Sequence, residues 1–390
     1  MPSLRTVPVD GSPESVADLA DALAAAIDGT GPAVRPVAAA GPPSPDPEGT
    51  LPDGAAVVVS TSGSTGEPKH VVLTAAALVA SARATEARLG GPARWVLPLP
   101  AEHVAGVQVI VRALLAGTPP QVQDIRDGFR PAGFARATAR LPHGAPRCTS
   151  LVPTQLLRIL DAGSAPLAAL QGYAAVLIGG AALDPALHQR ALTAGVRVRT
   201  TYGMSETAGG CVYDGVPLDG VTVEIDDDDR VLLGGPTIAE GYLGDAAATA
   251  EAFRDGWFRT GDLGRLDDGR LTVLGRADDV VVTGGKKVAP VAVERVLAAQ
   301  PGVSDACVVG LPDPEWGAVV AAAVVVDRDL GPECDRLAAA VRAELGRAAV
   351  PRRWLAVDAV PLRGIGKPDR TEVRRLLSAT TFTEDTSPIR

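Results

Sequence analysis

A loop rich in hydroxyl side chains and glycines, residues 61–69 (TSGSTGEPK), ends in a lysine and lies between two apolar segments. Backbone N–H groups and Ser or Thr hydroxyls can surround phosphate oxygens, and a lysine adds positive charge, so this loop is suited to a polyphosphate. It is not a Walker A loop, which has four residues between its glycines and a lysine followed by Ser or Thr. Taken alone, the same composition also describes a flexible surface turn.

Two more segments of this kind follow apolar runs. Residues 179–182 (GGAA) come after the run 174–178, where small residues let a flat ligand approach the backbone. Residues 200–207 (TTYGMSET) contain Tyr202, whose ring can stack on a base, and Glu206, whose carboxylate suits Mg²⁺. The alternatives are a tight turn for the first segment and, for the second, a core tyrosine beside a solvated glutamate.

Nearer the C-terminus, two segments combine a charged residue with glycines. Residues 256–264 hold Asp262, whose carboxylate can accept both hydroxyls of a ribose, although a plain Gly-Asp turn is the alternative. Residues 364–370 carry a lysine that is either a flexible tail charge or a catalytic cation. The chain has 37 basic residues but only four lysines, all in Gly- or Pro-containing segments: Lys69, Lys286, Lys287 and Lys367. Because lysine is a compact point charge and arginine a planar fork, we expect these lysines where arginine would not serve.

Alternating strand and helix patterns before residue 210 must position the first three segments. We predict a helix over residues 13–27 with Ser12 as N-cap, a loop over 31–54, strands at 55–60 and 71–73, and a helix over 75–89 capped by Thr74. Further strands are expected at 95–99, 174–178 and 196–200, and further helices at 105–116, 155–161 and 185–194. This alternation predicts parallel βαβ units.

The pattern of expected strands and helices changes twice after residue 210. Segments 221–225 with 230–233, and 265–266 with 271–274, are typical of antiparallel hairpins. From about residue 277 a small α+β pattern follows, with helices at 290–300 and 332–345 and strands at 280–282, 318–326 and 354–357. We therefore predict an α/β protein: a large domain of βαβ sheets plus an antiparallel β subdomain over residues 1–277, and a small α+β domain over residues 278–390.

Composition excludes several classes of function. The net charge of −9 and the absence of a strongly basic run argue against a nucleic-acid partner. No apolar run approaches the ~20 residues of a membrane-spanning helix, and the N-terminal segment lacks a signal-peptide core. The four cysteines are far apart without a CxxC pair, so we expect neither zinc nor a disulfide framework. We expect a cytoplasmic protein, and leave open whether it forms a homodimer.

Together, these segments and the glycine-rich stretches at 275–279 and 284–287 resemble, in order and approximate spacing over residues 57–370, the adenylate-forming superfamily. That superfamily comprises acyl-CoA synthetases, peptide-synthetase adenylation domains and firefly-type luciferases. The resemblance implies that a carboxylic acid and Mg·ATP form an acyl-adenylate with release of pyrophosphate. In the ligase members CoA then attacks the adenylate. ATP, Mg²⁺ and CoA are thus the implied cofactors and co-substrates, and the implied partners are small molecules.

The resemblance also assigns roles to individual residues. The β- and γ-phosphates would be held by Thr61, Ser62, Gly63, Ser64, Thr65, Gly66 and Lys69. The adenosine, α-phosphate and metal would be held by Gly180, Ala181, Ala182, Tyr202, Gly203, Ser205, Asp262 and Arg276, with Glu206 on Mg²⁺. Asp278 matches a hinge to a C-terminal lid. Lys367 would reach the α-phosphate during adenylation, and Gly284 and Gly285 would face the site during thioester formation.

The phosphate loop begins roughly a hundred residues earlier than is usual in the superfamily. This brevity, together with residues 98–106 and 149–156, resembles the o-succinylbenzoate–CoA ligase subgroup of menaquinone biosynthesis. In that reading Arg112 binds the second carboxylate of the substrate, Ser150 adds a hydroxyl and His103 lines the acyl or CoA entrance. The alternatives are a surface position or a buried salt bridge for Arg112, and a simply packed histidine for His103.

Two rival functions remain at this point. One is another aryl- or fatty-acyl-CoA ligase, or a stand-alone adenylation enzyme, of the same superfamily. The other is a catalytically inactive nucleotide-binding scaffold, and the presence of Lys69, Glu206 and Lys367 together argues against it.

Overall fold

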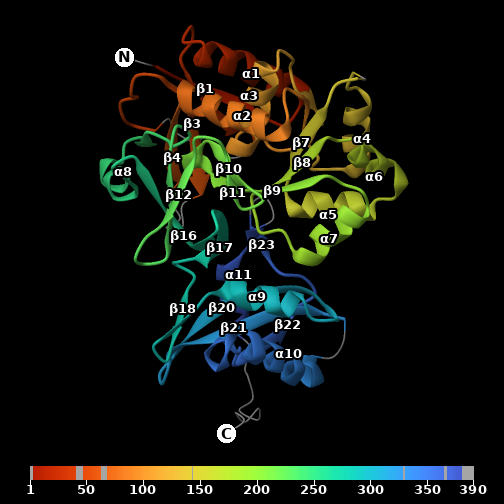
Figure 1. The fold of residues 1–390 in the computed structure, drawn as a ribbon, viewed down its shortest axis with the longest axis vertical. Coiled ribbons are helices and arrows are strands. Elements are labelled where there is room, and N and C mark those ends of the chain that lie inside the picture. The colour runs from red at the N-terminus through yellow and green to blue at the C-terminus, as the bar shows by residue number, and fades with distance from the viewer. Residues whose placement is uncertain are drawn as a thin grey trace.

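The computed structural model describes residues 3–40, 47–62, 68–142, 144–327, 330–363 and 367–379. Figure 1 shows two bodies along the long axis, the larger holding the first helices and strands of the chain and the smaller holding β18 and the later elements through α11. The larger body holds three sheets, and the smaller holds one main sheet and a two-stranded ribbon. This arrangement confirms the predicted α/β fold class. No helix in the described part of the chain is long and apolar enough to cross a membrane.

The first sheet carries the phosphate-loop segment. Its strands, in spatial order, are β1 (Leu4–Val9), β2 (Ala33–Ala38), β3 (Ala55–Ser62), β4 (Pro68–Thr74) and β14 (Gly241–Tyr242). The first three run parallel, whereas β4 returns antiparallel to β3 and β14 lies antiparallel to β4. Residues 61–69 therefore connect two adjacent strands, and a segment distant in sequence completes the sheet beside β4.

The predicted loop over residues 31–54 is wrong in part, because β2 runs through it. Ala33 and Val34 are fully buried there, yet Pro36 and the flanking glycines hide the strand in the sequence. A proline removes one ladder donor, which normally excludes it from the middle of a sheet. The ladder between β2 and β3 consists of the single pair Val34↔Val57, so Pro36 lies where that ladder has already ended.

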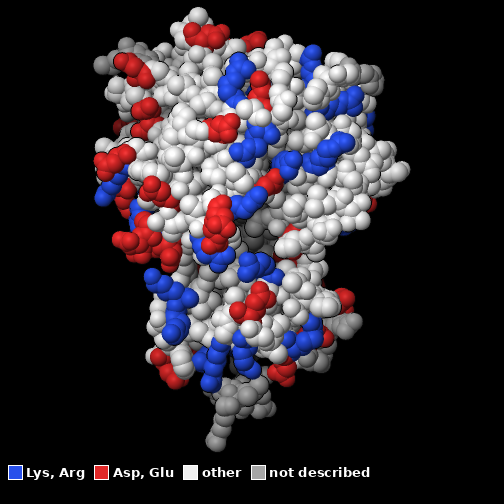
Figure 2. Space-filling model, in the orientation of Figure 1, with Lys and Arg blue, Asp and Glu red and all other residues white. Residues whose placement is uncertain are grey.

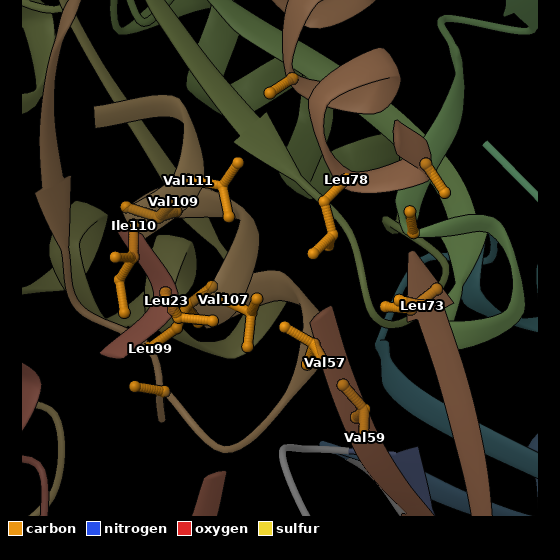
Figure 3. Close-up of a cluster of buried hydrophobic side chains, with 14 of the residues drawn as sticks. Leu23, Val57, Val59, Leu73, Leu78, Leu99, Val107, Val109, Ile110 and Val111 are labelled. Atoms are coloured by element: carbon orange, nitrogen blue, oxygen red, sulfur yellow. The ribbon is translucent and has the colours of Figure 1, made fainter. Parts of the chain in front are cut away.

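Helices pack between the first and second sheets. They are α1 (Pro13–Ile27), α2 (Ala75–Leu89) and α3 (Val104–Leu115), and α2 contacts β3, β4 and β10 while α3 contacts β5, β7 and β10. The side chains of Ser12 and Thr74 accept backbone hydrogen bonds at the starts of α1 and α2, which confirms the two predicted caps. Figure 3 shows the core that results, where apolar side chains of these helices meet β3 and β4: Leu23, Val57, Val59, Leu73, Leu78 and Val107.

The second sheet confirms the predicted βαβ pattern. Its parallel strands are β6 (Gln121–Val122), β5 (Arg94–Leu97), β7 (Arg147–Leu151), β8 (Ala175–Ile178) and β9 (Val198–Met204). Antiparallel β10 (Gly209–Tyr213) and β11 (Val216–Pro217) extend it beyond β9. The remaining helices of this region are α4 (Pro131–Ala139), α5 (Pro153–Asp161), α6 (Ser164–Gln171) and α7 (Pro185–Thr193).

The third sheet is antiparallel, as predicted. It contains β12 (Thr222–Ile225), β13 (Arg230–Gly234), β15 (Phe253–Arg254), β16 (Trp257–Asp267) and β17 (Arg270–Arg276), with the short helix α8 (Ala246–Ala252) before β15. Both predicted hairpins are present: β12 pairs with β13, and β16 pairs with β17.

The small body is α+β, as predicted. Its sheet contains β18 (Val281–Thr283), β19 (Lys286–Val288), β20 (Val303–Asp313), β21 (Gly317–Val326) and β22 (Arg353–Ala356), with helices α9 (Pro290–Ala298), α10 (Leu330–Leu345) and α11 (Arg370–Ala379). The ribbon is β23 (Leu362–Arg363) with β24 (Lys367–Pro368). Sequence reasoning missed β20 because Gly310 and Pro312 interrupt its pattern. The two hydrophobic clusters of this body contain only residues from Val281 onward.

Arg370 anchors the start of α11. Its guanidinium donates to both carboxylate oxygens of Glu294 and to the Val308 carbonyl oxygen, and its Nε lies 3.1 Å from an oxygen of Asp279. Only 15% of the Arg370 side chain is exposed, and the Glu294 side chain is equally buried. Removing one partner of such a group leaves buried charge without compensation.

We therefore expect Arg370→Ala to lower the free energy of unfolding of the small body by about 3–5 kcal/mol. Urea unfolding followed by tryptophan fluorescence measures this change. The matched control is Arg375→Ala, which removes the exposed Arg375–Glu372 pair from the same helix and should change the free energy by less than about 1 kcal/mol. Equal losses in the two variants would contradict the anchoring role of Arg370.

Candidate active site

Tyr202 and Asp262 meet where the second and third sheets adjoin. Tyr202, on β9, donates its hydroxyl to Asp262 Oδ2 at 2.8 Å, and Asp262 comes from β16. Burial, together with the negative charge of Asp262, raises the pKa of the Tyr202 hydroxyl, so this group stays protonated and acts as the donor. The structure thus brings together two residues predicted for the base and for the ribose.

The predicted adenine loop leaves the sheet beside them. Strand β8 runs parallel to β9, with Ile178 opposite Thr200, and Thr201 Oγ1 donates to the Ile178 carbonyl oxygen at 3.2 Å. Gly180, Ala181 and Ala182 therefore follow the carboxyl end of β8 next to Tyr202, the usual place for a ligand in a parallel sheet.

Gly203 permits a close approach between β9 and β10. A Cβ atom at this position would lie 2.1 Å from the Gly209 carbonyl oxygen, so no other residue fits without moving a strand. A bulge in the β9–β10 pairing follows directly, and the 3-10 turn Ser205–Thr207 connects the two strands. Ser205 is buried in this turn, whereas Glu206 is half-buried.

A residue that the sequence did not single out, Tyr242, connects Glu206 to Lys69. The Tyr242 hydroxyl donates to Glu206 Oε1 at 3.0 Å, and Lys69 Nζ lies 4.6 Å from the centre of the Tyr242 ring. The available signal was its rarity, because the chain has only four tyrosines. The candidate phosphate lysine and the candidate metal ligand thus share one aromatic neighbour.

Glu206 offers a single carboxylate, which suits Mg²⁺ better than it suits a metal ion that needs several protein ligands. Among the described residues, no group of three or more His, Cys, Asp or Glu side chains could hold a metal ion. Mg²⁺ commonly takes one or two carboxylates and completes its shell with water and substrate phosphates. Glu206 is therefore suited to an ion that arrives with a polyphosphate.

The phosphate loop is described only at its base. Ser62 pairs with Pro68 and Thr61 with Lys69 across the β3–β4 hairpin, and Thr61 Oγ1 donates to the Lys69 carbonyl oxygen at 3.4 Å. Gly63, Ser64, Thr65 and Gly66 lie outside the described residues, as does the Ser62 side chain. The hairpin nevertheless returns Lys69 to the first sheet beside β14.

Arg276 connects Asp262, the predicted ribose acceptor, to the predicted hinge. It lies opposite Asp262 on β17, with Nη1 3.7 Å from Asp262 Oδ1, and it donates two hydrogen bonds to Asp278 at 3.0 and 3.1 Å. Burial alone would raise the pKa of Asp278, but the hydrogen bond and charge of Arg276 outweigh it and lower the pKa. Asp278 is therefore ionised at neutral pH and holds the guanidinium.

The three predicted acyl-pocket residues come from two neighbouring elements, α3 and β7. His103 is half-buried at the N-cap of α3, Ser150 is buried in β7, and Arg112 lies nine residues along α3 from His103, about 13 Å at 1.5 Å per residue.

Arg112 is a buried cation, so the surface alternative for this residue is wrong. It is 6% exposed, its guanidinium lies 5.3 Å from the Trp95 ring centre, and Nη2 donates to the Tyr213 hydroxyl at 3.4 Å. Its Nε has no hydrogen-bond partner, and no carboxylate among the described residues lies within 4.0 Å. The second alternative, a buried salt bridge, is therefore not found in the described part of the chain.

The predicted lid residues lie in the small body. The backbone of Lys367 pairs with Arg363 in the β23–β24 ribbon, which Figure 1 places at the junction of the two bodies, but its side chain lies outside the described residues. Gly284 and Gly285 form the turn between β18 and β19, and a Cβ at Gly284 would lie 2.6 Å from the Trp316 ring. Figure 2 shows a hollow between the bodies with basic and acidic side chains at its rim.

Comparison with known proteins places this chain among nucleotide-dependent enzymes. Residues 5–243 match the family model described as AMP-binding enzyme, and residues 292–367 match its C-terminal domain. A probable 2-succinylbenzoate–CoA ligase of Mycobacterium tuberculosis is 46% identical over 327 residues, which cover 83% of this chain and 85% of the relative.

Two solved structures are also similar to this chain over nearly its whole length. The amide bond synthetase McbA from Marinactinospora thermotolerans is 30% identical with a TM-score of 0.75, covering 96% of this chain and 80% of that one. Wild-type E. coli MenE, with a bound m-phenylether-linked analogue of OSB-AMS, is 26% identical with a TM-score of 0.75, covering 97% and 89%.

We expect Asp262→Asn to weaken ATP binding roughly ten- to a hundredfold, because it removes the charge that strengthens hydrogen bonds to a ribose. Equilibrium binding of ATP to the purified protein measures this loss. Asp267→Asn is the matched control, since Asp267 lies on the same strand with its side chain 56% exposed. Similar losses in the two variants would show that Asp262 is not part of the nucleotide site.

Proposed function

The chain belongs to the AMP-binding enzyme family, and from this premise we propose that it converts o-succinylbenzoate, ATP and CoA into o-succinylbenzoyl-CoA, AMP and pyrophosphate. The observation that supports this most is the convergence of Tyr202, Asp262 and Arg276 beside the Glu206–Tyr242–Lys69 group. A base-stacking ring, a ribose acceptor, a metal ligand and a phosphate cation then lie together at the ends of the strands.

In the first half-reaction, a substrate carboxylate oxygen attacks the α-phosphorus of ATP and pyrophosphate leaves. Positioning and charge neutralisation supply most of the catalysis in such a transfer. Lys69 binds the terminal phosphates beside the loop 61–66, Ser205 contacts the α-phosphate, and Glu206 binds Mg²⁺. When bound, that ion neutralises charge on the phosphate oxygens. Gly180–Ala182, Tyr202 and Gly203 hold the adenine.

The second carboxylate of o-succinylbenzoate needs a partner, and Arg112 supplies the charge. A buried guanidinium whose Nε has no partner is costly, and a substrate carboxylate in reach would offset that cost. In this proposal Ser150 adds a hydroxyl to the acyl pocket and His103 lines its entrance. The buried cation favours a dicarboxylate over benzoate or a fatty acid.

In the second half-reaction, the CoA thiol attacks the acyl carbonyl carbon of the adenylate and AMP leaves. We propose that residues 1–277 and 278–390 are domains that rotate about Asp278 between the two steps. Their separate hydrophobic clusters support this division. Lys367 acts in adenylation, and the turn with Gly284 and Gly285 then replaces it beside the CoA channel.

The substrate is tested by a CoA-consumption assay with o-succinylbenzoate, benzoate, succinate and medium-chain fatty acids. We expect o-succinylbenzoate to be turned over best, and Arg112→Met to raise its KM roughly ten- to a hundredfold while the KM for ATP stays unchanged. Equal or better turnover of a simple acid would refute the assignment. Because one structural neighbour is an amide bond synthetase, an amine acceptor in place of CoA is tested in parallel by the release of AMP, which both reactions share. Retained ATP binding without pyrophosphate exchange for any acid would instead support the scaffold.

We expect Lys367→Ala to slow adenylate formation roughly a hundred- to a thousandfold, since it removes a cation from the developing charge at the α-phosphate. Thioester formation from supplied acyl-adenylate should remain near the wild-type rate. Pyrophosphate exchange and single-turnover thioester formation measure the two steps separately. If both rates fall by the same factor, the alternation of the two domains is not the mechanism.

A further inference from the structure

We propose that Tyr242 is a positioning residue: it keeps Lys69 and Glu206 apart and places both side chains where they can bind Mg·ATP. This inference rests on the proposed function, whose phosphate and metal residues it extends. Tyr242 is 8% exposed, and its ring and hydroxyl contact the two charged groups separately. Neither the base site nor the acyl pocket includes it.

The backbone around Tyr242 joins the two parts of the site. The amide of Ala239 donates to the Glu206 carbonyl oxygen at 2.9 Å, and the amide of Leu243 donates to the His70 carbonyl oxygen at 2.8 Å. Between them, β14 pairs Tyr242 with Val71 of the strand that carries Lys69. One short segment therefore fixes the turn with Glu206 relative to β4.

The Tyr242 ring has little freedom to turn. Phe253 packs edge-on against it, with ring centres 5.5 Å apart and planes at 68°. The Tyr242 amide donates to Thr249 Oγ1 at 2.9 Å, and Gly241 has a φ of +140°, where a Cβ would lie 2.4 Å from Thr249 Cγ2. These contacts direct the hydroxyl at Glu206 before any ligand binds.

The charges explain why a tyrosine serves here. A lysine and a glutamate this close to a common neighbour attract each other, and a direct ion pair would occupy both groups. No such pair within 4.0 Å joins Lys69 and Glu206 among the ion pairs of the described residues. Instead the ring face attracts Lys69, as aromatic faces attract cations, and the hydroxyl donates to Glu206. Both charges stay available for phosphate and Mg²⁺.

Tyr242→Phe tests the hydroxyl alone, because it keeps the ring under Lys69. We expect the Mg²⁺ concentration for half-maximal ATP binding to rise roughly tenfold, the scale of one hydrogen bond to a charged group. Calorimetric titration of ATP at a series of Mg²⁺ concentrations, without any acid substrate, measures the shift. ATP affinity at saturating Mg²⁺ should stay near that of the wild type. Tyr242→Leu removes the ring as well, and it should lower that affinity too.

Tyr173→Phe is the matched control. Tyr173 is fully buried and its hydroxyl lies 2.7 Å from Thr138 Oγ1, away from the nucleotide residues, so this variant reports the general effect of deleting a buried hydroxyl. Its Mg²⁺ dependence should equal that of the wild type. An unchanged Mg²⁺ dependence in Tyr242→Phe, or an equal shift in Tyr173→Phe, would overturn the proposal.

A second measurement separates positioning from folding. In a Glu206→Gln background, Tyr242→Phe should produce no further shift in Mg²⁺ dependence, since the hydroxyl acts through the carboxylate. A further shift of the same size would overturn the proposal, whatever the thermal stability of the variants. The ATP titrations need no acid, so they are independent of the substrate assay. A chain that turns over no acid but shows the Tyr242→Phe shift would fail as a ligase while keeping Tyr242 in this role.

Discussion

The hydrogen bond from Tyr202 to Asp262 crosses from the parallel second sheet to the antiparallel third sheet, and the proposed nucleotide site depends on that crossing. Tyr202, the ring proposed to stack on the base, comes from the second sheet, and Asp262, the proposed ribose acceptor, comes from the third. Asp262 in turn lies opposite Arg276, which also binds Asp278 at the start of the small body. A chain of three polar contacts therefore connects Tyr202, the residue proposed for the base, to the segment about which the small body is proposed to rotate.

The residues proposed for the phosphates and Mg²⁺ are held in place by a different kind of contact. Lys69 lies in the first sheet and Glu206 in the turn between two strands of the second, and in our proposal their opposite charges have to be kept from neutralising each other. Tyr242 does this with two contacts of different kind, and β14 makes its place part of the first sheet. The side proposed for the acid is simpler, because Arg112 is a single buried cation whose guanidinium lies over the Trp95 ring. The residues proposed for the nucleotide thus form two groups of contacting side chains, whereas the residues proposed for the acid act one by one.

Much of this arrangement could be predicted from the sequence, since caps, apolar periods and turn residues are local signals. Ser12 and Thr74 begin their helices as expected, and the hairpins of the third sheet lie where acidic and glycine turns indicated. β2 could not be predicted, because a proline such as Pro36 argues against a strand. Only the structure shows that the ladder between β2 and β3 is a single pair, which leaves room for that proline. Tyr242 was missed because its importance comes from neighbours more than thirty residues away in the chain. The lack of a hydrogen-bond partner at Arg112 Nε could not be predicted either, since burial and hydrogen bonding of a side chain depend on the tertiary structure.

The placement of β14 has a consequence for how the protein is made. Strands β1 to β4 are complete by residue 74, but the strand that borders β4 is contributed by Gly241 and Tyr242. Contacts between such distant segments form late, because the intervening chain has to be ordered first. During synthesis, the edge of β4 stays open until the ribosome has released the chain beyond residue 242. An open strand edge is a site of mispairing, so β4 is exposed to aggregation during that interval.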